Sequence, residues 1–529
     1  MTTFPRSARL LMLTTMLVAL AMGLLTSQAL ARKAYTLNYD AGTAVAIDTA
    51  TNQVVGAPIP VGTQPYSNAI TPDGKYMYVL SDGEDNVRVV DLQTGQVVGA
   101  PIALPGSPTE VAISPDGKTA YVGDETNDQI VVISTATNQI VGAPIPIGTD
   151  IWGVAFAPDG KTAYVAGEGS NSVYVIDTQT AQVVGAPITV GVEPINIAFT
   201  PDGKFAYVSN EGSGTVSVID TQTRQSIATI PVGVEPWGVA ITPDGSKAYV
   251  VNLDDGTVSV INTQTRAVVG APITVGEGPY EIALTPDGKA AYVVNYDGDS
   301  VSVINTQTDQ VSATISDPGG PWQIAIAPDQ SPTAALKVGA AKAGKPTKFN
   351  AGASTDADGL IAAFNWSFGD GKAATSTTAT ASHKYKKAGK YSPSLTVTDN
   401  EGCSTAIVFT GRTAYCSGSA LATATKEITV IAPNDFKFGK LTKNRRNGSA
   451  KLKVKVPAAG VLTVSGSQVR SAKRKTGKPK TLTLTIRPKA KLKKSLATSG
   501  RAQVRIKIKF SPKGGPARTK GKTLSLIQG

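Results

Sequence analysis

Residues 238–275 read GVAITPDGSKAYVVNLDDGTVSVINTQTRAVVGAPITV, and this stretch decides the fold class. Apolar and polar residues alternate in four short runs, which are separated by the turn-forming segments Pro-Asp-Gly, Asp-Asp-Gly and Thr-Gln-Thr. Alternation with a period of two is typical of β-strands with two distinct faces, and Asp-Gly supplies the positive φ of a tight hairpin. The stretch is therefore predicted to form a four-stranded antiparallel unit.

The same unit recurs along residues 32–330. Its Pro-Asp-Gly turn begins at Pro72, Pro115, Pro158, Pro201, Pro243 and Pro286, with a degenerate seventh copy at Pro328-Asp329. A period of 42 or 43 residues with four strands per unit is the signature of a β-propeller blade, so a seven-bladed propeller is predicted. The first unit starts with its second strand, at Ala34, and the last ends with an inner strand, at Ala327. We expect these two segments to complete one blade and close the ring.

Two recurring motifs carry a family resemblance. Ala-Tyr-Val-x-Asn (Ala206 to Asn210) is followed by Val-Ser-Val-Ile-Asp (Val216 to Asp220), together with the turn Pro-Asp-Gly-Lys. This order resembles the YVTN β-propeller repeat family, which implies an exported or cell-surface protein. Related seven-bladed propellers include lactonases.

A different pattern occupies residues 331–432. Phe364-Asn-Trp-Ser-Phe-Gly-Asp-Gly is followed by His383-Lys-Tyr and by Leu395-Thr-Val-Thr-Asp, an order that resembles the PKD domain, an Ig-like β-sandwich. Trp366 and Phe368 alternate as inward residues of one strand. His383 is interpreted as a structural member of its turn, because no hydrolase motif surrounds it.

Residues 433–529 are predicted to form a basic β domain, with 27 Lys and Arg against one acidic residue, whereas residues 32–330 hold 11 against 32. Two of its strands alternate cations with apolar residues, and the cations are Lys451, Lys453, Lys455, Arg505, Lys507 and Lys509. We expect these rows to bind polyanions such as envelope polymers or lipid headgroups, with the acidic propeller as an alternative partner. Sequence-specific nucleic-acid binding is not expected, because aromatic residues are scarce there.

Two features indicate export. Arg6 and Arg9 precede an apolar stretch and the small-x-small sequence Ala29-Leu30-Ala31, which predicts a signal peptide over residues 1–31; a membrane anchor is the alternative. The predicted location is secreted, extracellular or cell-surface associated, with no later transmembrane span. Cys403 and Cys416 lie in one loop, so a disulfide worth about 3 kcal/mol is predicted, with two free thiols as the alternative.

The candidate ligand site lies where the inner strands begin. Five of seven residues at one repeated position are aromatic, namely Tyr66, Trp152, Trp237, Tyr280 and Trp322. They form either a stacking ring at the channel mouth or part of the inter-blade core, and strand alternation favours the core. The following residues, which include Glu110, Asn196, Glu281 and Gln323, would then point the other way and line the channel.

The residue inventory bounds the chemistry. A single His excludes His-rich metal sites, haem ligation by His pairs and Ser-His-Asp catalysis away from His383. Acidic loops, and Asp356 with Asp358, could take Ca²⁺, but they lack EF-hand spacing, so no metal or cofactor is predicted. The sequence predicts a binding or structural protein rather than an enzyme, in which the propeller and the PKD-like domain recognise proteins or carbohydrates. A lactonase-type enzyme using Glu110 and Glu281 is the alternative.

Overall fold

The computed structural model describes residues 32–529. The predicted signal peptide, residues 1–31, lies outside the described part of the chain. The described residues form two compact units, the first made of residues 32–333, 355–362 and 398–422, and the second of residues 334–354, 363–397 and 423–529. Both units are built from β-sheets, as predicted.

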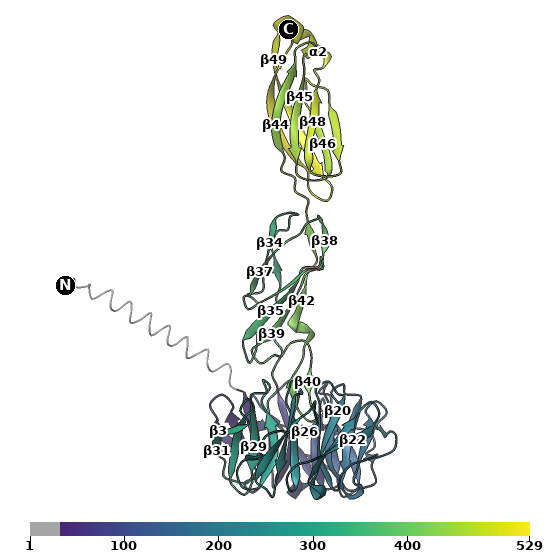
Figure 1. Cartoon of the computed structure of the whole chain (residues 1–529), viewed down its shortest axis with the longest axis vertical. Coiled ribbons are helices and arrows are strands. Elements are labelled where there is room, and N and C mark those ends of the chain that lie inside the picture. The colour runs from purple at the N-terminus through teal and green to yellow at the C-terminus, as the bar shows by residue number, and fades with distance from the viewer. Residues whose placement is uncertain (1–31) are drawn as a thin grey trace, which may run out of the picture. The chain divides into compact units, whose positions relative to one another are not determined.

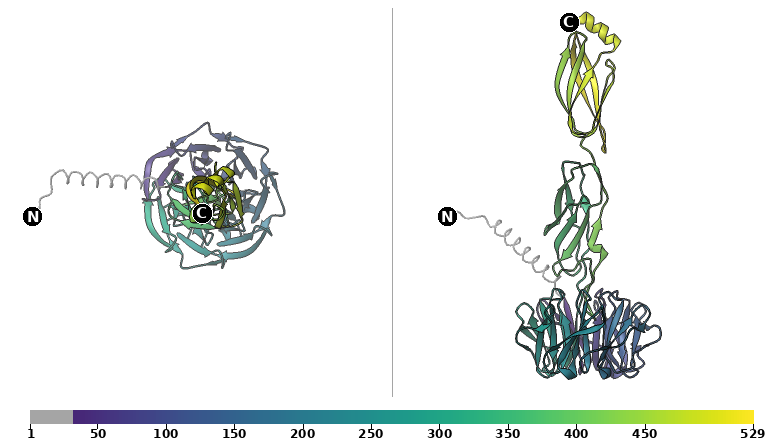
Figure 2. Two further views of the ribbon diagram at one scale, coloured as in Figure 1. Left: turned by 90° about the horizontal axis from the view of Figure 1, so that it is seen from above. Right: turned by 45° about the vertical axis from the view of Figure 1, so that its right-hand side comes forward.

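The first unit contains seven sheets arranged radially around an axis (Figures 1 and 2). The innermost strands are β4 (Pro65–Ile70), β9 (Pro108–Ile113), β14 (Ile151–Phe156), β19 (Pro194–Phe199), β23 (Pro236–Ile241), β28 (Pro279–Leu284) and β32 (Pro321–Ile326). The second strands are β1 (Lys33–Asn38), β5 (Tyr76–Ser81), β10 (Thr119–Asp124), β15 (Thr162–Gly167), β20 (Phe205–Asn210), β24 (Lys247–Asn252) and β29 (Ala290–Asn295). The third strands are β2 (Thr43–Asp48), β6 (Asn86–Asp91), β11 (Gln129–Ser134), β16 (Ser172–Asp177), β21 (Thr215–Asp220), β25 (Thr257–Asn262) and β30 (Ser300–Asn305).

The outermost strands differ between blades. Three are continuous: β3 (Gln53–Pro60), β22 (Gln225–Pro231) and β31 (Gln310–Ser316). The others are split into pairs: β7 (Gln96–Val97) and β8 (Ile102–Ala103), β12 (Gln139–Ile140) and β13 (Ile145–Pro146), β17 (Gln182–Val183) and β18 (Ile188–Thr189), β26 (Ala267–Val268) and β27 (Ile273–Thr274). Every split strand carries Gly-Ala-Pro at the break, where proline cannot donate to the ladder, and the continuous strand β3 accommodates the same three residues with a register shift. We number the blades 1 to 7 in chain order, beginning with the sheet that contains β1.

The predicted ring closure is confirmed. Strand β1 pairs with β32 in antiparallel register, with Ala34 opposite Ile326 and Thr36 opposite Ile324. Blade 1 therefore combines the start and the end of the propeller, and neither segment is left with an exposed edge.

Buried tyrosines of the second strands donate hydrogen bonds to the following blade at four positions: Tyr78, Tyr207, Tyr249 and Tyr292. Tyr207 is fully buried and donates its hydroxyl hydrogen to the carbonyl oxygen of Thr263 in the following blade, at 3.2 Å. Tyr292 of blade 7 makes the same bond to Thr49 of blade 1, also at 3.2 Å. At these four positions a buried aromatic ring with a satisfied hydroxyl lies between neighbouring blades.

The second unit begins with the strands of the PKD-like region. They form the sheets β33 (Lys337–Val338), β34 (Pro346–Asn350) and β37 (Thr380–Lys384); β36 (Ala373–Ser376), β35 (Ile361–Ser367), β39 (Ser394–Asp399) and β42 (Thr423–Thr425); and β38 (Gly389–Tyr391) with β43 (Ile428–Val430). Trp366 and Phe368 are buried, as the alternation predicts. The ring of His383 stacks on Phe368 at 4.2 Å and contacts Asp370 at 2.8 Å, so this histidine supports its turn.

The basic region forms a second sandwich. Its sheets are β44 (Lys437–Asn444), β45 (Ser449–Val456) and β48 (Lys480–Ile486), and β47 (Ala472–Thr476), β46 (Gly460–Ser465), β49 (Arg501–Pro512) and β50 (Arg518–Ile527), with helix α2 (Ala490–Ser499) between β48 and β49. The intervening apolar side chains form its core. All six candidate cations are exposed, three on β45 and three on β49. Because β45 and β49 belong to different sheets, the six cations form two separate rows.

Candidate functional site

One end of the propeller channel is occupied by residues 408–416, which we call the plug. It consists of β40 (Val408–Phe409), β41 (Ala414–Cys416) and the turn between them. Four consecutive plug residues accept backbone N–H groups from the last residues of four consecutive inner strands: Thr410 from Phe199 at 2.7 Å, Gly411 from Phe156 at 2.8 Å, Arg412 from Ile113 at 3.3 Å, and the Thr413 hydroxyl from Ile70 at 3.4 Å. In blades 5, 4, 3 and 2, the plug thereby provides an acceptor for a backbone N–H group on the channel-facing edge of the inner strand.

Arg412 reaches from the plug into the channel. Its guanidinium forms ion pairs with Glu110 of blade 3 and with Glu281 of blade 7, the latter at 3.0 Å. Glu110 also accepts the backbone N–H of Val154 at 3.0 Å, and Glu281 accepts the side-chain amide of Asn196 at 2.9 Å. Burial raises the pKa of Glu110 to about 7, although Arg412 opposes the rise. Both candidate carboxylates therefore line the channel, as expected, but an arginine that sequence reasoning missed neutralises them.

Glycines make room for these two carboxylates. At the matching positions of blades 4 and 6 stand Gly153 and Gly238. A Cβ on Gly153 would lie 3.2 Å from Glu110 Oε2 and 2.2 Å from the carbonyl oxygen of Ile195. A Cβ on Gly238 would lie 2.6 Å from Glu281 Oε1. The missing side chains of Gly153 and Gly238 therefore leave the space that the two buried carboxylates occupy.

The opposite end of the channel carries a cluster of half-buried aromatic rings, which we call the aromatic mouth. Its members are Tyr39, Tyr66, Trp152, Trp237, Tyr280, Tyr296 and Trp322. Trp322 stacks on Tyr280 with a centroid distance of 3.9 Å, and Trp152 meets Trp237 edge-on at 5.5 Å. None of the seven rings belongs to the hydrophobic clusters between blades in the described residues.

The inter-blade core interpretation of these aromatic residues is therefore wrong. The reason is a β-bulge near the start of each inner strand: Pro236 pairs with Asn252, but Val239 pairs with Val250, so the inner strand uses one extra residue. The same irregularity occurs in all seven inner strands. A bulge breaks the two-residue alternation, so aromatic and polar residues that are adjacent in sequence both face the channel.

A small cavity of about 20 Å³ separates the aromatic layer from the polar layer, a size that holds about one water molecule. Its lining consists of four of the aromatic residues, Ile195 and six polar residues: Tyr66, Trp152, Trp237, Trp322, Ile195, Ser67, Thr109, Glu110, Asn196, Glu281 and Gln323. Thr109 Oγ1 and Asn196 Oδ1 face it without a hydrogen-bond partner among the described residues, and the two side chains belong to residues only 4% and 3% exposed.

Carboxylates surround the aromatic mouth, and we call them the acidic rim: Asp82, Glu125, Asp150, Glu168, Glu193, Glu211 and Glu235. Backbone bonds between neighbouring loops hold them together, for example from Glu211 N to Glu193 O at 2.8 Å. Within the described residues none of the seven forms an ion pair. Desolvation, followed by repulsion from Glu235, Glu168 and Glu193, raises the pKa of Glu211 to about 7.

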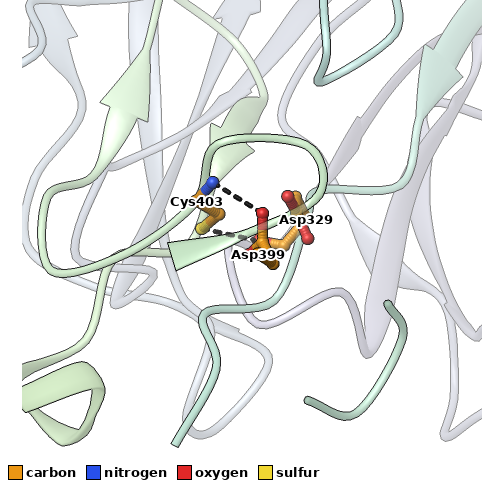
Figure 3. Close-up of side chains that lie close together, drawn as sticks. All are labelled: Asp329, Asp399 and Cys403. Atoms are coloured by element: carbon orange, nitrogen blue, oxygen red, sulfur yellow. Dashed lines mark hydrogen bonds between the residues drawn. The ribbon is translucent and has the colours of Figure 1, made fainter. Parts of the chain in front are cut away.

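A second acidic cluster contains Asp329, Asp399 and Cys403 (Figure 3). Asp399 accepts the backbone N–H of Cys403 at 2.8 Å. Cys403 forms the predicted disulfide with Cys416, at a Cα–Cα distance of 5.4 Å, so its sulfur is not a thiolate ligand. The Arg32 guanidinium pairs with Asp329. Carboxylate oxygens suit Ca²⁺, but in this arrangement a buried arginine takes the cation's place.

Comparisons with known proteins agree with two domain types. Residues 329–413 match the family model of the PKD domain, and residues 124–319 match that of the cytochrome D1 heme domain. The PKD-like region is similar to part of a microbial collagenase from Vibrio alginolyticus, at 39% identity over 82 residues, 15% of this chain and 10% of that protein. The protein therefore combines a β-propeller with a PKD domain. It spans only a small part of this curated relative.

Solved structures share the propeller fold. A functionally unknown protein from Desulfotomaculum acetoxidans has a TM-score of 0.50 at 21% identity, covering 56% of this chain and 98% of its own. A putative 6-phosphogluconolactonase from Bacteroides uniformis has a TM-score of 0.50 at 17% identity, covering 56% and 99%. At these identities the likeness concerns the fold. Among the described residues, no helix has the length and apolar character needed to cross a membrane.

The prediction that the protein is not an enzyme is contradicted by these comparisons. The family model that matches residues 124–319 is that of a heme domain, and the propeller relatives include a putative lactonase. A missing His-based constellation was therefore an inadequate reason to exclude enzymes. The heme itself does not fit the matched segment by histidine ligation, because the single His of the chain, His383, stacks on Phe368 in the PKD region.

Proposed function

We propose that this is an exported, extracellular or cell-surface recognition protein whose propeller captures its ligand at the aromatic mouth. The observation that carries the proposal is the cluster of seven half-buried rings, which covers the channel and lies outside the hydrophobic clusters described between the blades. Partly exposed aromatic residues gathered in one place mark recognition sites for sugars, peptides and other flat or apolar groups.

The plug supports recognition at this end of the channel. It fills the other end with backbone hydrogen bonds and buries Arg412 between Glu110 and Glu281. A ligand that approaches along the channel axis can therefore reach the described propeller only from the aromatic mouth. The extracellular location is supported by the likeness of the PKD domain to the one in a microbial collagenase and by the disulfide. Within the same proposal, the PKD domain contributes to protein or carbohydrate recognition.

We further assign attachment to the basic sandwich. Lys451, Lys453 and Lys455 project from one strand, and the paired strand opposite them carries Thr481, Thr483 and Thr485. Cations about 6.7 Å apart, interleaved with hydroxyl groups, match the phosphate repeats of anionic envelope polymers better than a solvated surface of mixed charge would.

The test of ligand recognition is a glycan array and a peptide array probed with the full chain. Trp152→Ala and Trp237→Ala are expected to remove the bound signal. Tyr76→Ala is the matched control, because Tyr76 is 37% exposed and lies next to a Pro-Asp-Gly turn at the other end of the blade. Equal binding by all three variants would show that the mouth is not the recognition site.

A further inference from the structure

We propose that the aromatic mouth and its acidic rim bind an organic cation, that is, an alkylammonium or guanidinium group. This inference rests on the proposed function, because it names the chemistry of the ligand at the same mouth. The group is presented either by a lysine- or arginine-rich peptide or by a small quaternary ammonium compound.

The aromatic surface suits a cation. The faces of Trp and Tyr carry partial negative charge, and a cation within about 6 Å of a ring centroid is attracted by about 0.5 to 2 kcal/mol. Trp322 contacts Tyr39, Tyr66, Trp237, Tyr280 and Tyr296, with centroids 3.9 to 6.4 Å away. A ligand resting on Trp322 therefore meets several rings at once.

The charge distribution of the propeller points the same way. Of the 11 Lys and Arg in residues 32–330, ten lie at the start of the propeller, after the Pro-Asp-Gly turns or in the turns after the third strands, all at the plug end. The remaining cation, Arg88, pairs with Glu84. The seven rim carboxylates thus face the ligand position without a compensating cation among the described residues. Such a field attracts cations and repels anions.

Two buried oxygen atoms beneath the rings are a second, independent indication that the ligand carries hydrogen-bond donors. Thr109 Oγ1 and Asn196 Oδ1 are buried without a hydrogen-bond partner in the described residues and line the cavity directly under the aromatic layer. Leaving a buried polar atom unpaired costs about 1 to 3 kcal/mol. A lysine ammonium or an arginine guanidinium group supplies N–H donors to these oxygen atoms, directly or through a water molecule, whereas a quaternary ammonium group has no N–H and would leave them to water.

The test uses tryptophan fluorescence of the full chain, because three of its four Trp residues, Trp152, Trp237 and Trp322, lie in the mouth. The probes are hexalysine, tetramethylammonium and the neutral sugar maltohexaose, titrated at pH 8 and constant ionic strength. The rim variant combines Glu125→Gln, Glu168→Gln and Glu211→Gln.

The control variant combines Asp91→Asn, Asp177→Asn and Asp220→Asn, which removes the same charge at the plug end. Blades 6 and 7 already carry Asn262 and Asn305 at the equivalent positions, where their side-chain oxygens accept the same turn N–H groups. The control is therefore expected to fold normally.

We expect a cationic probe to bind, with affinity at least tenfold weaker in the rim variant and unchanged in the control. Binding of hexalysine identifies a peptide source, and binding of tetramethylammonium alone identifies a small quaternary ammonium compound. Equal weakening in both variants would overturn the inference. Maltohexaose binding that Trp152→Ala abolishes, without binding of either cation, overturns the inference and leaves the proposed recognition site standing. If no probe binds and neither array gives a signal, both the cation inference and the proposed recognition site are refuted.

Discussion

Arg412 and Glu110 lie 302 residues apart in the sequence and form a buried ion pair inside the propeller channel. The pair joins a loop inserted after the PKD strand β39 to the third blade. Glu281 of the seventh blade contacts the same guanidinium at 3.0 Å. One arginine therefore links opposite parts of the ring, and its loop closes one end of the channel.

Removing this arginine is expected to destabilise the propeller. Arg412→Met leaves two buried carboxylates without a counter-charge, which costs about 3 to 5 kcal/mol of the free energy of unfolding. Denaturant unfolding followed by circular dichroism measures the loss. The triple variant Arg412→Met, Glu110→Gln, Glu281→Gln is the control and should recover most of the stability, since no buried charge remains. A single variant as stable as the native protein would show that the ion pairs are not needed.

Breaking the disulfide is expected to loosen the plug. Cys403→Ser with Cys416→Ser removes a crosslink over a sequence separation of 13 residues, worth about 3 kcal/mol. Hydrogen exchange should then accelerate at the amides of Phe156 and Phe199, which donate to the plug. The amide of Ala206, which pairs with Ile219 in the β20–β21 ladder, serves as the internal reference. Unchanged protection at Phe156 and Phe199 would mean that the plug stays seated without the crosslink.

The propeller is expected to lose stability as the pH rises from about 5.5 to 8. The pKa of Glu211 and that of Glu110 are both raised to about 7, so the folded state binds more protons than the unfolded state in this window. Stability therefore falls with pH, since ionisation is less favourable in the fold. Glu211 faces Glu168, Glu193, Glu235 and Tyr280.

Thermal unfolding at several pH values measures this dependence. The variant with Glu125→Gln, Glu168→Gln and Glu211→Gln should show a smaller decrease of the Tm between pH 5.5 and 8. A Tm that rises across this window would contradict the assigned direction of the pKa shifts.

The cation rows of the basic sandwich are expected to carry envelope attachment. Replacing Lys451, Lys453 and Lys455 by Gln should weaken binding to polyphosphate and to isolated cell walls and reduce its dependence on salt, because fewer counterions are released. The matched control replaces the neighbouring Thr481, Thr483 and Thr485 by Ala and should keep the salt dependence. Cosedimentation at rising NaCl concentrations measures both. Retention of the lysine variant at high salt would refute an electrostatic attachment.

The repeat was sufficient to predict the blades. Pro-Asp-Gly turns and alternating strands recur in every unit, and the ring closure through Ala34 and Ile326 follows from the register of incomplete first and last units. The alternation of Lys and apolar residues likewise predicted which face of β45 is exposed. These features depend on local periodicity, which the sequence records directly.

The site was harder to predict. Strict alternation favours the core over the channel mouth for Trp237, and the β-bulge between Pro236 and Val239 reverses that preference. Bulges leave only weak sequence signals, although the proline that precedes four of the five aromatic residues is one that could have been used. No local sequence pattern indicated that Arg412 belongs to the site. Its partners Glu110 and Glu281 both lie in the propeller repeats, far from it in the sequence.

Periodicity and composition were enough to predict the seven blades, the closing of their ring, the PKD-like strands and the segregation of acidic and basic residues, since each is a property of short segments. Two features could be seen only in the folded chain: a loop from the PKD region fills the channel, and seven aromatic rings meet at its other end. Both depend on contacts between residues far apart in the chain. Whether such distant residues meet depends on how the folded elements pack against each other, and no local sequence pattern records that packing.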